Sequence, residues 1–201
     1  MCSGCFSLER HRLLIDYIEC ELPAMLNDSC QILHLAAEAC VSWRVRQNAN
    51  ATYVTADNMS QFIDGLEEAP DHVMDITDLN FEDETFDYVI CYHVLEHVPD
   101  DQQGMGELYR VLKQGGVGLI NVPLRRESSQ TLEDTTLNDE QRALQYGAAD
   151  HLRYYGVDDF KSRLERAGFT VMVRDYGRET ELDEVKNGIM THEKIVVSTK
   201  A

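Results

Sequence analysis

Acidic residues stand at the ends of two apolar runs of this chain. Asp57 closes the run ATYVTAD, and Asp75 followed by Ile76 lies in the weaker run DHVMDIT. A carboxylate at the carboxyl end of a parallel strand can accept two hydrogen bonds from a ribose diol. A carboxylate beside a branched apolar side chain suits adenine, because the acid accepts the exocyclic amine and the apolar group packs on the ring. The sequence therefore predicts a nucleoside site; the alternatives are a solvated strand end for Asp57 and a turn for Asp75.

A third group, Cys91, Tyr92 and His93, closes the run FDYVICYHV. In open α/β sheets, ligands bind beyond the carboxyl ends of the strands, so we expect this group to border the same site. Cys91 and Tyr92 are predicted to contact the ligand, and His93 is a candidate general base. The alternative for Tyr92 and His93 is a packing role.

Further candidate catalytic groups follow a polar stretch, in the run DHLRYYG. Asp150, His151 and Arg153 are placed to reach an acidic or hydroxylated second ligand, and His97 is a weaker candidate. A histidine that titrates near pH 7 suits removal of a proton from a hydroxyl group. The alternative is an internal ion pair between Asp150 and Arg153 that fixes the polar stretch.

The loop after the first apolar run contains no glycine between residues 33 and 40. We predict that His34, Ala36 and Glu38, in this loop, contact the ligand. Ala36 adds only a methyl group, which is tolerated close to a ligand provided that its φ is negative. Glu38 adds a carboxylate that can pair with a cationic group. The alternative is a degenerate loop that binds nothing.

Strands and helices alternate along the chain and must position these residues. Asp100 and Asp101 favour a helix start, and Gly115-Gly116 is predicted to end that helix. The last two strands follow each other without a strong helix between them, so they are predicted to be antiparallel. This pattern is typical of an α/β sandwich. Strands are predicted at 30–36, 51–57, 71–77, 86–94, 117–123, 169–176 and 192–200, helices near 8–18, 39–47, 100–114 and 157–168, and a short helix or loop at 60–67.

Residues 125–150 are polar, acidic and too long for an ordinary connection. We predict an insertion over the mouth of the site, helical around residues 140–144; the alternative is a surface loop. The rest of residues 1–201 is predicted to be a single domain, with an N-terminal segment at 1–20 whose helix buries Leu13, Leu14, Tyr17 and Ile18.

Composition narrows the classes of function. The 201 residues include 36 Asp and Glu against 18 Lys and Arg, a net charge of −18, which argues against a nucleic-acid substrate because phosphates would be repelled. No apolar run is long enough to span a bilayer and no signal peptide is evident, so a cytoplasmic location without membrane association is expected. Of the six cysteines, four are expected to be small core residues: Cys20, Cys30, Cys40 and Cys91.

Three segments, FEDETFDYVICYHVLEHVPDD, ELYRVLKQGGVGLINVP and DHLRYYGVDDFKSRLERAGF, resemble class I S-adenosylmethionine (SAM) dependent methyltransferases. LHLAAE at 33–38 is similar to the Leu-His-x-Ala-Pro-Glu loop of one group of that family, with Ala37 in place of proline. The resemblance covers nearly the whole chain. It implies a Rossmann-like sandwich, with a mostly parallel seven-stranded sheet and a C-terminal antiparallel hairpin.

The resemblance also implies SAM as the cofactor. Asp57 would then hold the ribose, Asp75 and Ile76 the adenine, and the loop at 33–40 with Cys91 and Tyr92 would lie near the methionine end. Members of the same group often carry a Cys-x-x-Cys pair followed by Arg-His-Arg, here Cys2, Cys5 and residues 10–12. A structural zinc site wants four ligands, so no metal site is predicted.

The expected function is SAM-dependent methyl transfer to a small-molecule or sugar-like acceptor, with the oligomeric state left open. One alternative is a methyltransferase-like binding or scaffold protein with a degenerate loop. A dinucleotide oxidoreductase is disfavoured, because no Gly-x-Gly-x-x-Gly motif occurs and the terminal hairpin does not suit that fold.

Overall fold

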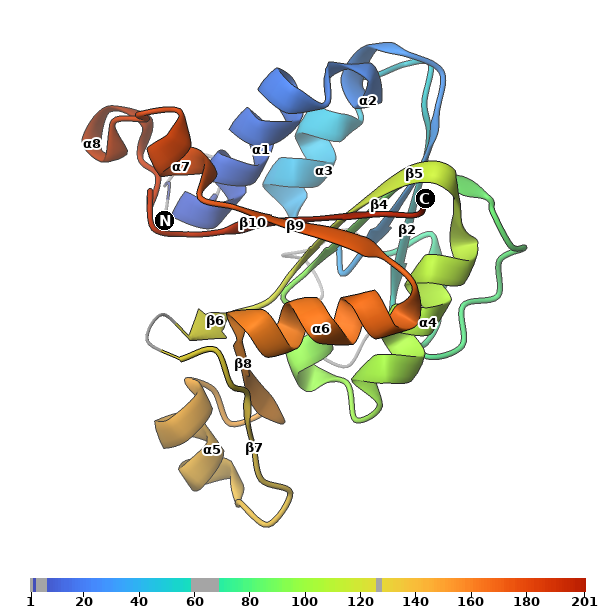
Figure 1. The fold of residues 1–201 in the computed structure, drawn as a ribbon. Helices are drawn as coiled ribbons and strands as arrows, with labels where there is room; N and C mark the ends of the chain where they lie inside the picture. Colours follow the sequence, from blue (N-terminus) through green and yellow to red (C-terminus); the bar gives the residue numbers. More distant parts are fainter. Residues whose placement is uncertain (1, 3–6, 59–68, 126–127) are drawn as a thin grey trace.

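The computed structural model describes residues 2, 7–58, 69–125 and 128–201, and a sheet of seven strands forms its centre (Figure 1). The strand order is β3-β2-β1-β4-β5-β10-β9. The first five strands are parallel, and β10 is antiparallel to both β5 and β9. The predicted α/β sandwich with an antiparallel hairpin is confirmed. The strands are β1 Gln31–Leu35, β2 Thr52–Asp57, β3 His72–Val73, β4 Phe86–Tyr92, β5 Leu112–Asn121, β9 Thr170–Arg174 and β10 Ile195–Thr199.

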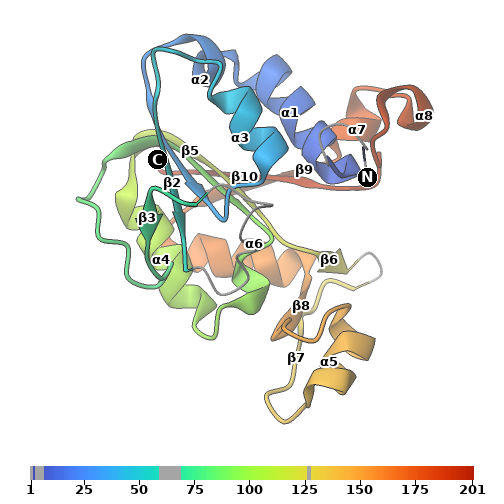
Figure 2. The same cartoon turned by 180° about the vertical axis from the view of Figure 1, so that it is seen from behind.

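Helices cover both faces of this sheet (Figures 1 and 2). On one face lie α1 Glu9–Glu21, α2 Pro23–Asn27 and α3 Ala39–Val45, near the short helices α7 Tyr176–Glu179 and α8 Glu184–Asn187. On the other lie α4 Asp101–Val111 and α6 Val157–Ala167. Successive residues of β4 enter two different cores: Val89 and Cys91 pack with α4 and α6, and Ile90 and Tyr92 pack with α1 and α3. A central strand buried on both sides has no polar face.

Helix α4 begins as predicted, because the Asp100 side chain accepts a hydrogen bond from Gln103 N at 3.0 Å. The predicted end at Gly115-Gly116 is wrong, since α4 ends at Val111 and both glycines lie in β5. Gly115 has a φ of 75° and donates to Lys200 O, beside a register shift in the pairing with β4. The glycines therefore serve a strand irregularity.

The polar insertion forms a small lobe of its own (Figure 1). It contains β6 Leu124–Arg125, β7 Leu132–Glu133, α5 Asp139–Tyr146 and β8 Arg153–Gly156, with the sheet order β6-β8-β7. The predicted helix is present and begins with a capping box between Asn138 and Gln141. The 3₁₀ helix η1 Leu95–His97 lies between the lobe and β4.

Arg153 fastens the lobe to the main domain. Its side chain is 2% exposed, and its guanidinium donates to Leu95 O at 3.0 Å, Val98 O at 2.5 Å and Pro99 O at 3.0 Å. It also pairs with Glu133 at 2.8 Å. With Glu133 and Asp101 as its carboxylate partners, Arg153 has the internal, lobe-fixing role that was the alternative to contact with an acceptor, although Asp150 was the partner predicted for that role.

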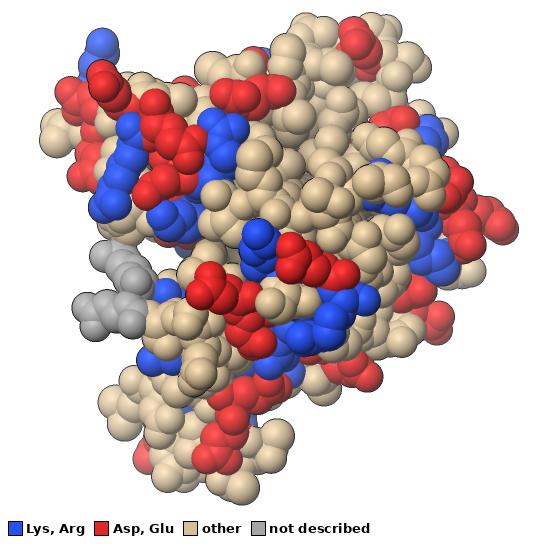
Figure 3. All heavy atoms as spheres, viewed as in Figure 1, with Lys and Arg blue, Asp and Glu red and all other residues tan. Residues whose placement is uncertain are grey.

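Acidic side chains lie among lysines and arginines on the face shown in Figure 3, where they form no single continuous patch. Among the described helices, none has both the length and the apolar character that crossing a bilayer requires. Cys30 and Cys91 are buried as predicted, Cys40 is half-buried, and the prediction for Cys20 is wrong because it is exposed.

Candidate functional site

A cavity of about 160 Å³ opens at the carboxyl ends of β1, β2, β3 and β4. It brings together five of the predicted site residues, Ala36, Asp57, Asp75, Ile76 and His93. The other lining residues are Leu35, Ala56, Asn58, Met74, Val94, His97, Val98 and Pro99. Of these, only His97 was a candidate from the sequence, and Met74 could have been found from its place beside Asp75.

The two acidic positions differ in what their carboxylates already do. Asp57 ends β2 and lines the cavity directly. Asp75 Oδ1 accepts hydrogen bonds from Thr77 N at 2.8 Å and Thr77 Oγ1 at 2.7 Å, so one of its oxygens builds the turn after β3. The predicted turn role of Asp75 is therefore present, together with its position in the cavity wall next to Ile76.

Ala36 holds an unusual backbone conformation where the chain leaves β1. Its φ is 47°, in the left-handed region, and its N–H donates to Ala56 O at 2.9 Å. The condition of a negative φ is thus not met, and a non-glycine residue there stores about 1 kcal/mol of strain. Its methyl group is nevertheless small enough to leave the cavity open beside Asp57.

His34 belongs to the interior and not to the cavity. Its side chain is fully buried; Nδ1 lies 2.7 Å from Tyr53 Oη, and Nε2 lies 3.1 Å from Glu38 Oε2. Both ring nitrogens are engaged inside the protein, so the imidazole is not free to bind a cofactor. His34 instead orients Glu38, the residue that precedes α3.

One carboxylate oxygen of Glu38 forms a hydrogen bond and the other forms none with the described residues. Oε2 is bonded to His34, whereas Oε1 is buried, makes no hydrogen bond with the described residues and lies 3.5 Å from His11 Nε2. Burial alone would raise the pKa of Glu38, but the hydrogen bond from His34 and the nearby histidines lower it overall. Burial lowers the pKa of His11 to about 4, against the opposing effect of Glu38. His11 is therefore neutral near pH 7, and Glu38 is a carboxylate with an unused acceptor.

Cys91 and Tyr92 do not reach the cavity with their side chains. They are 0% and 2% exposed and lie in the two cores on opposite faces of β4. Burial raises the pKa of the Cys91 thiol and of the Tyr92 phenol well above their ordinary values, so both stay neutral. A strand buried on both faces turns alternate side chains into alternate cores, so any contact of these two residues with a ligand would be through the main chain at the end of β4.

His93 follows them and turns into the cavity. Its φ is 55°, its N–H donates to Asn121 O at 2.9 Å, and its Nδ1 lies 3.3 Å from Glu96 Oε1. Glu96 is 1% exposed, and sequence reasoning missed it. His97 Nε2 lies 3.9 Å from the same carboxylate oxygen. The site thus holds two cavity-lining imidazoles against one buried acid.

Asp150 and His151 meet this group from the lobe. Asp150 Oδ2 lies 3.2 Å from His97 Nδ1, and the rings of His97 and His151 pack edge to face with centroids 4.8 Å apart. Leu152 N donates to Glu96 O at 2.8 Å and joins the end of the lobe to η1. The structure therefore brings two of the candidate catalytic residues close to His97, at the border of the cavity.

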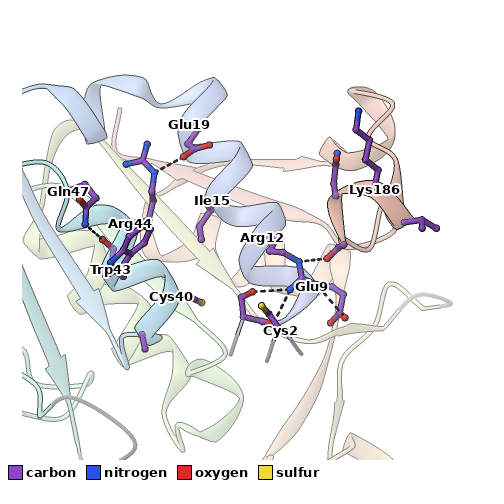
Figure 4. Close-up of a pocket in the computed structure, with 15 residues that line it drawn as sticks. Cys2, Glu9, Arg12, Ile15, Glu19, Cys40, Trp43, Arg44, Gln47 and Lys186 are labelled. Carbon is purple, nitrogen blue, oxygen red and sulfur yellow. Dashed lines mark hydrogen bonds and ion pairs between the residues drawn. The ribbon is translucent and has the colours of Figure 1, made fainter. Parts of the chain in front are cut away.

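A second and larger cavity, of about 1210 Å³, lies among α1, α3 and α8 (Figure 4). Its wall combines the exposed Trp43 with ion-paired groups such as Arg44, which donates to Glu19 at 2.6 Å. Among the described residues that line it, none ends a strand of the sheet. We therefore assign the nucleoside site to the smaller cavity.

Comparison with known proteins shows similarity to methyltransferases. Residues 36–120 match the family described as "Methyltransferase domain". A probable S-adenosylmethionine-dependent methyltransferase of Mycolicibacterium smegmatis is 33% identical over 96 residues, which are 48% of this chain and 33% of that protein. The matched part spans about a third or less of the length of the curated relatives.

Solved structures show the same fold at low sequence identity. A SAM-dependent methyltransferase from Archaeoglobus fulgidus has a TM-score of 0.60 at 13% identity and covers 94% of each chain. The 1,6-didemethyltoxoflavin-N1-methyltransferase of Burkholderia thailandensis, solved with S-adenosylhomocysteine, has a TM-score of 0.60 at 13% identity over 95% of this chain and 78% of that one. At such identity the likeness establishes the fold alone.

Proposed function

We propose that this chain, whose residues 36–120 match the family described as "Methyltransferase domain", is a class I SAM-dependent methyltransferase that transfers a methyl group from SAM to a small-molecule acceptor. The observation that carries the proposal is the convergence of Ala36, Asp57, Asp75, Ile76 and His93 on one cavity at the strand ends. This is where open α/β sheets bind their ligands.

The residues present suit an adenosyl sulfonium. Asp57 accepts hydrogen bonds from the ribose diol, and Ile76 packs on the adenine beside Asp75. Glu38 is not among the residues that line the cavity, and its buried Oε1 faces His11 Nε2 at 3.5 Å, so it would support an ammonium group from behind the loop and not by direct contact in the present cavity. When bound, the cofactor provides the electrophilic methyl group. The described walls enclose less than the roughly 300–1,000 Å³ of a typical small-molecule site, so binding requires the cavity to widen.

His93 is the residue best placed to take a proton from an acceptor. It lines the cavity, its Nε2 has no hydrogen-bond partner among the described residues, and its Nδ1 faces Glu96. A carboxylate behind an imidazole stabilises the imidazolium that forms when the ring accepts a proton. The acidic surface favours a small or sugar-like acceptor over a nucleic acid.

Calorimetric titration with SAM, S-adenosylhomocysteine and NAD tests the proposal. We expect micromolar binding of the two adenosyl sulfur compounds and a rise in the melting temperature with each, and neither effect with NAD. No heat and no thermal shift with SAM would reject the methyltransferase function and favour a binding protein with a degenerate loop.

A further inference from the structure

Three metal-binding side chains gather at the border of the cavity. Glu96, His97 and His151 each offer one ligand atom, and these atoms all lie within 4.8 Å of one another. Glu96 and His97 come from η1, and His151 comes from the lobe. Two imidazoles and one carboxylate form a donor set that suits a divalent transition metal.

The carboxylate of Glu96 provides a second, independent observation. Its side chain is 1% exposed, and neither carboxylate oxygen accepts a hydrogen bond from the described residues. Its nearest polar neighbours are His93 Nδ1 at 3.3 Å and His97 Nε2 at 3.9 Å. A buried carboxylate without hydrogen bonds is costly, and such charges are normally paired or coordinate metals.

In each of the two histidines, Nδ1 faces another protein group, which leaves Nε2 as the atom that can coordinate a metal. His151 Nδ1 lies 2.9 Å from Tyr146 O, and a carbonyl can only accept, so Nδ1 carries the proton and Nε2 keeps its lone pair. His97 Nδ1 lies 3.2 Å from Asp150 Oδ2. Imidazole ligands usually present their second nitrogen to a carbonyl or carboxylate in this way.

We propose that Glu96, His97 and His151 bind one divalent cation of the zinc class, with Asp150 and Tyr146 as outer supports. Ligands about 2.1 Å from one ion lie no more than about 4.2 Å apart, so the three side chains need only a small rotation to close on it. Both histidines are half-buried, which leaves the ion a route of entry. Three protein ligands leave a fourth position open.

The open position identifies a class of acceptor, and this part rests on the proposed function. His97 lines the cavity, so a ligand bound beside the cofactor can place an oxygen on the ion. A coordinated hydroxyl has a lowered pKa and becomes a better nucleophile near pH 7. The acceptors favoured are therefore hydroxyl-bearing small molecules that coordinate through oxygen.

Metal binding is measured first, without SAM, in a Cys2→Ser, Cys5→Ser background that removes the N-terminal thiols. Titration with Zn²⁺ against a chromophoric chelator is expected to show one tight site. His151→Gln and Glu96→Gln should each weaken it by about 100-fold or more, and Asp150→Asn by about 10–100-fold. His192→Gln, a histidine in the segment before β10, is the matched control and should leave the affinity unchanged.

The outcomes separate this inference from the proposed function. No Zn²⁺ site, or a weak site that His151→Gln leaves unaltered, would overturn the metal proposal even if SAM binds. Zinc binding without SAM binding would support the site and reject the methyl-transfer role. Because Glu96→Gln alters a buried residue, His151→Gln at a half-buried position provides the test if that variant fails to fold.

Discussion

Among single residues, Asp57 gives the most direct test of the proposed SAM site. Its carboxylate ends β2 in the wall of the cavity, where the two hydroxyls of a ribose would each donate to it. Hydrogen bonds to a charged group contribute about 1.5–3 kcal/mol each. We expect Asp57→Ala to weaken SAM binding by about 10–100-fold or more in calorimetry, with Asp139→Ala, an acidic change on α5, as the neutral control. Equal affinity in both variants would remove Asp57 from the site.

His11 gives the protein a pH dependence of stability. Burial lowers its pKa to about 4, whereas the unfolded chain has the ordinary value near 6.5. As the pH falls from about 6.5 towards 4, the unfolded state binds a proton that the folded state does not, so stability is lost in that window, by at most about 3 kcal/mol.

Urea unfolding of the wild type and His11→Gln at pH 7 and pH 4.5 measures this contribution. The wild type should lose more stability between the two pH values than the variant. His72→Gln, at an exposed position on the edge strand β3, should lose as much as the wild type. Identical losses in the wild type and His11→Gln would contradict the burial argument.

Some residues of the site could be predicted from the local sequence pattern, and others could not because their burial depends on tertiary contacts. Asp57, Asp75 and Ile76 were predictable because each follows an apolar run. The burial of the His34 and Tyr92 side chains was not predicted, because a strand covered on both faces buries polar and apolar side chains alike. The role of Glu96 was not predicted, because its surroundings include Leu152 and the lobe, more than 50 positions further along the chain.

At the scale of elements, Gly156 couples the lobe to α6. A Cβ atom there would lie 2.3 Å from the main-chain carbon and oxygen of Ser129, so the backbone of the lobe would have to shift. We expect Gly156→Ala to cost about 3 kcal/mol and to lower the melting temperature by about 6–12 °C.

The matched control is Gly106→Ala within α4. No atom lies within 4 Å of a Cβ at Gly106, and alanine is a better helix former by about 1 kcal/mol, so this variant should be slightly more stable. Thermal unfolding by circular dichroism checks both. A Gly156→Ala protein as stable as the wild type would mean that the lobe is not tightly joined to α6.

Strands and helices were largely predictable because their apolar spacing is strong, as in α6, where Phe160 and Leu164 are buried. The end of α4 was not, because the Gly115 turn is determined by its pairing with Lys200 across the sheet. The role of Arg153 was also hidden, since its partners are main-chain carbonyls of η1 and the turn after it. Contacts of this kind depend on tertiary structure and not on local spacing.

At the scale of the whole molecule, the net charge of −18 opposes compaction. The repulsion is long-ranged and is screened within about 10 Å at 0.1 M salt. We expect the melting temperature at pH 7.5 to rise between low salt and about 0.2 M NaCl. Near the isoelectric point of 4.6 the same salt should have little effect, and an equal rise there would contradict the charge argument.

The position of β10 between β5 and β9 has a consequence for how the protein is made. Among the described strands, β9 pairs only with β10, so it cannot join the sheet until Ile195–Thr199 has been synthesised and has left the ribosome. The earlier strands can associate during synthesis, whereas β9 stays unpaired and one edge of β5 stays exposed until β10 is available. An unpaired strand edge of this kind invites misassembly.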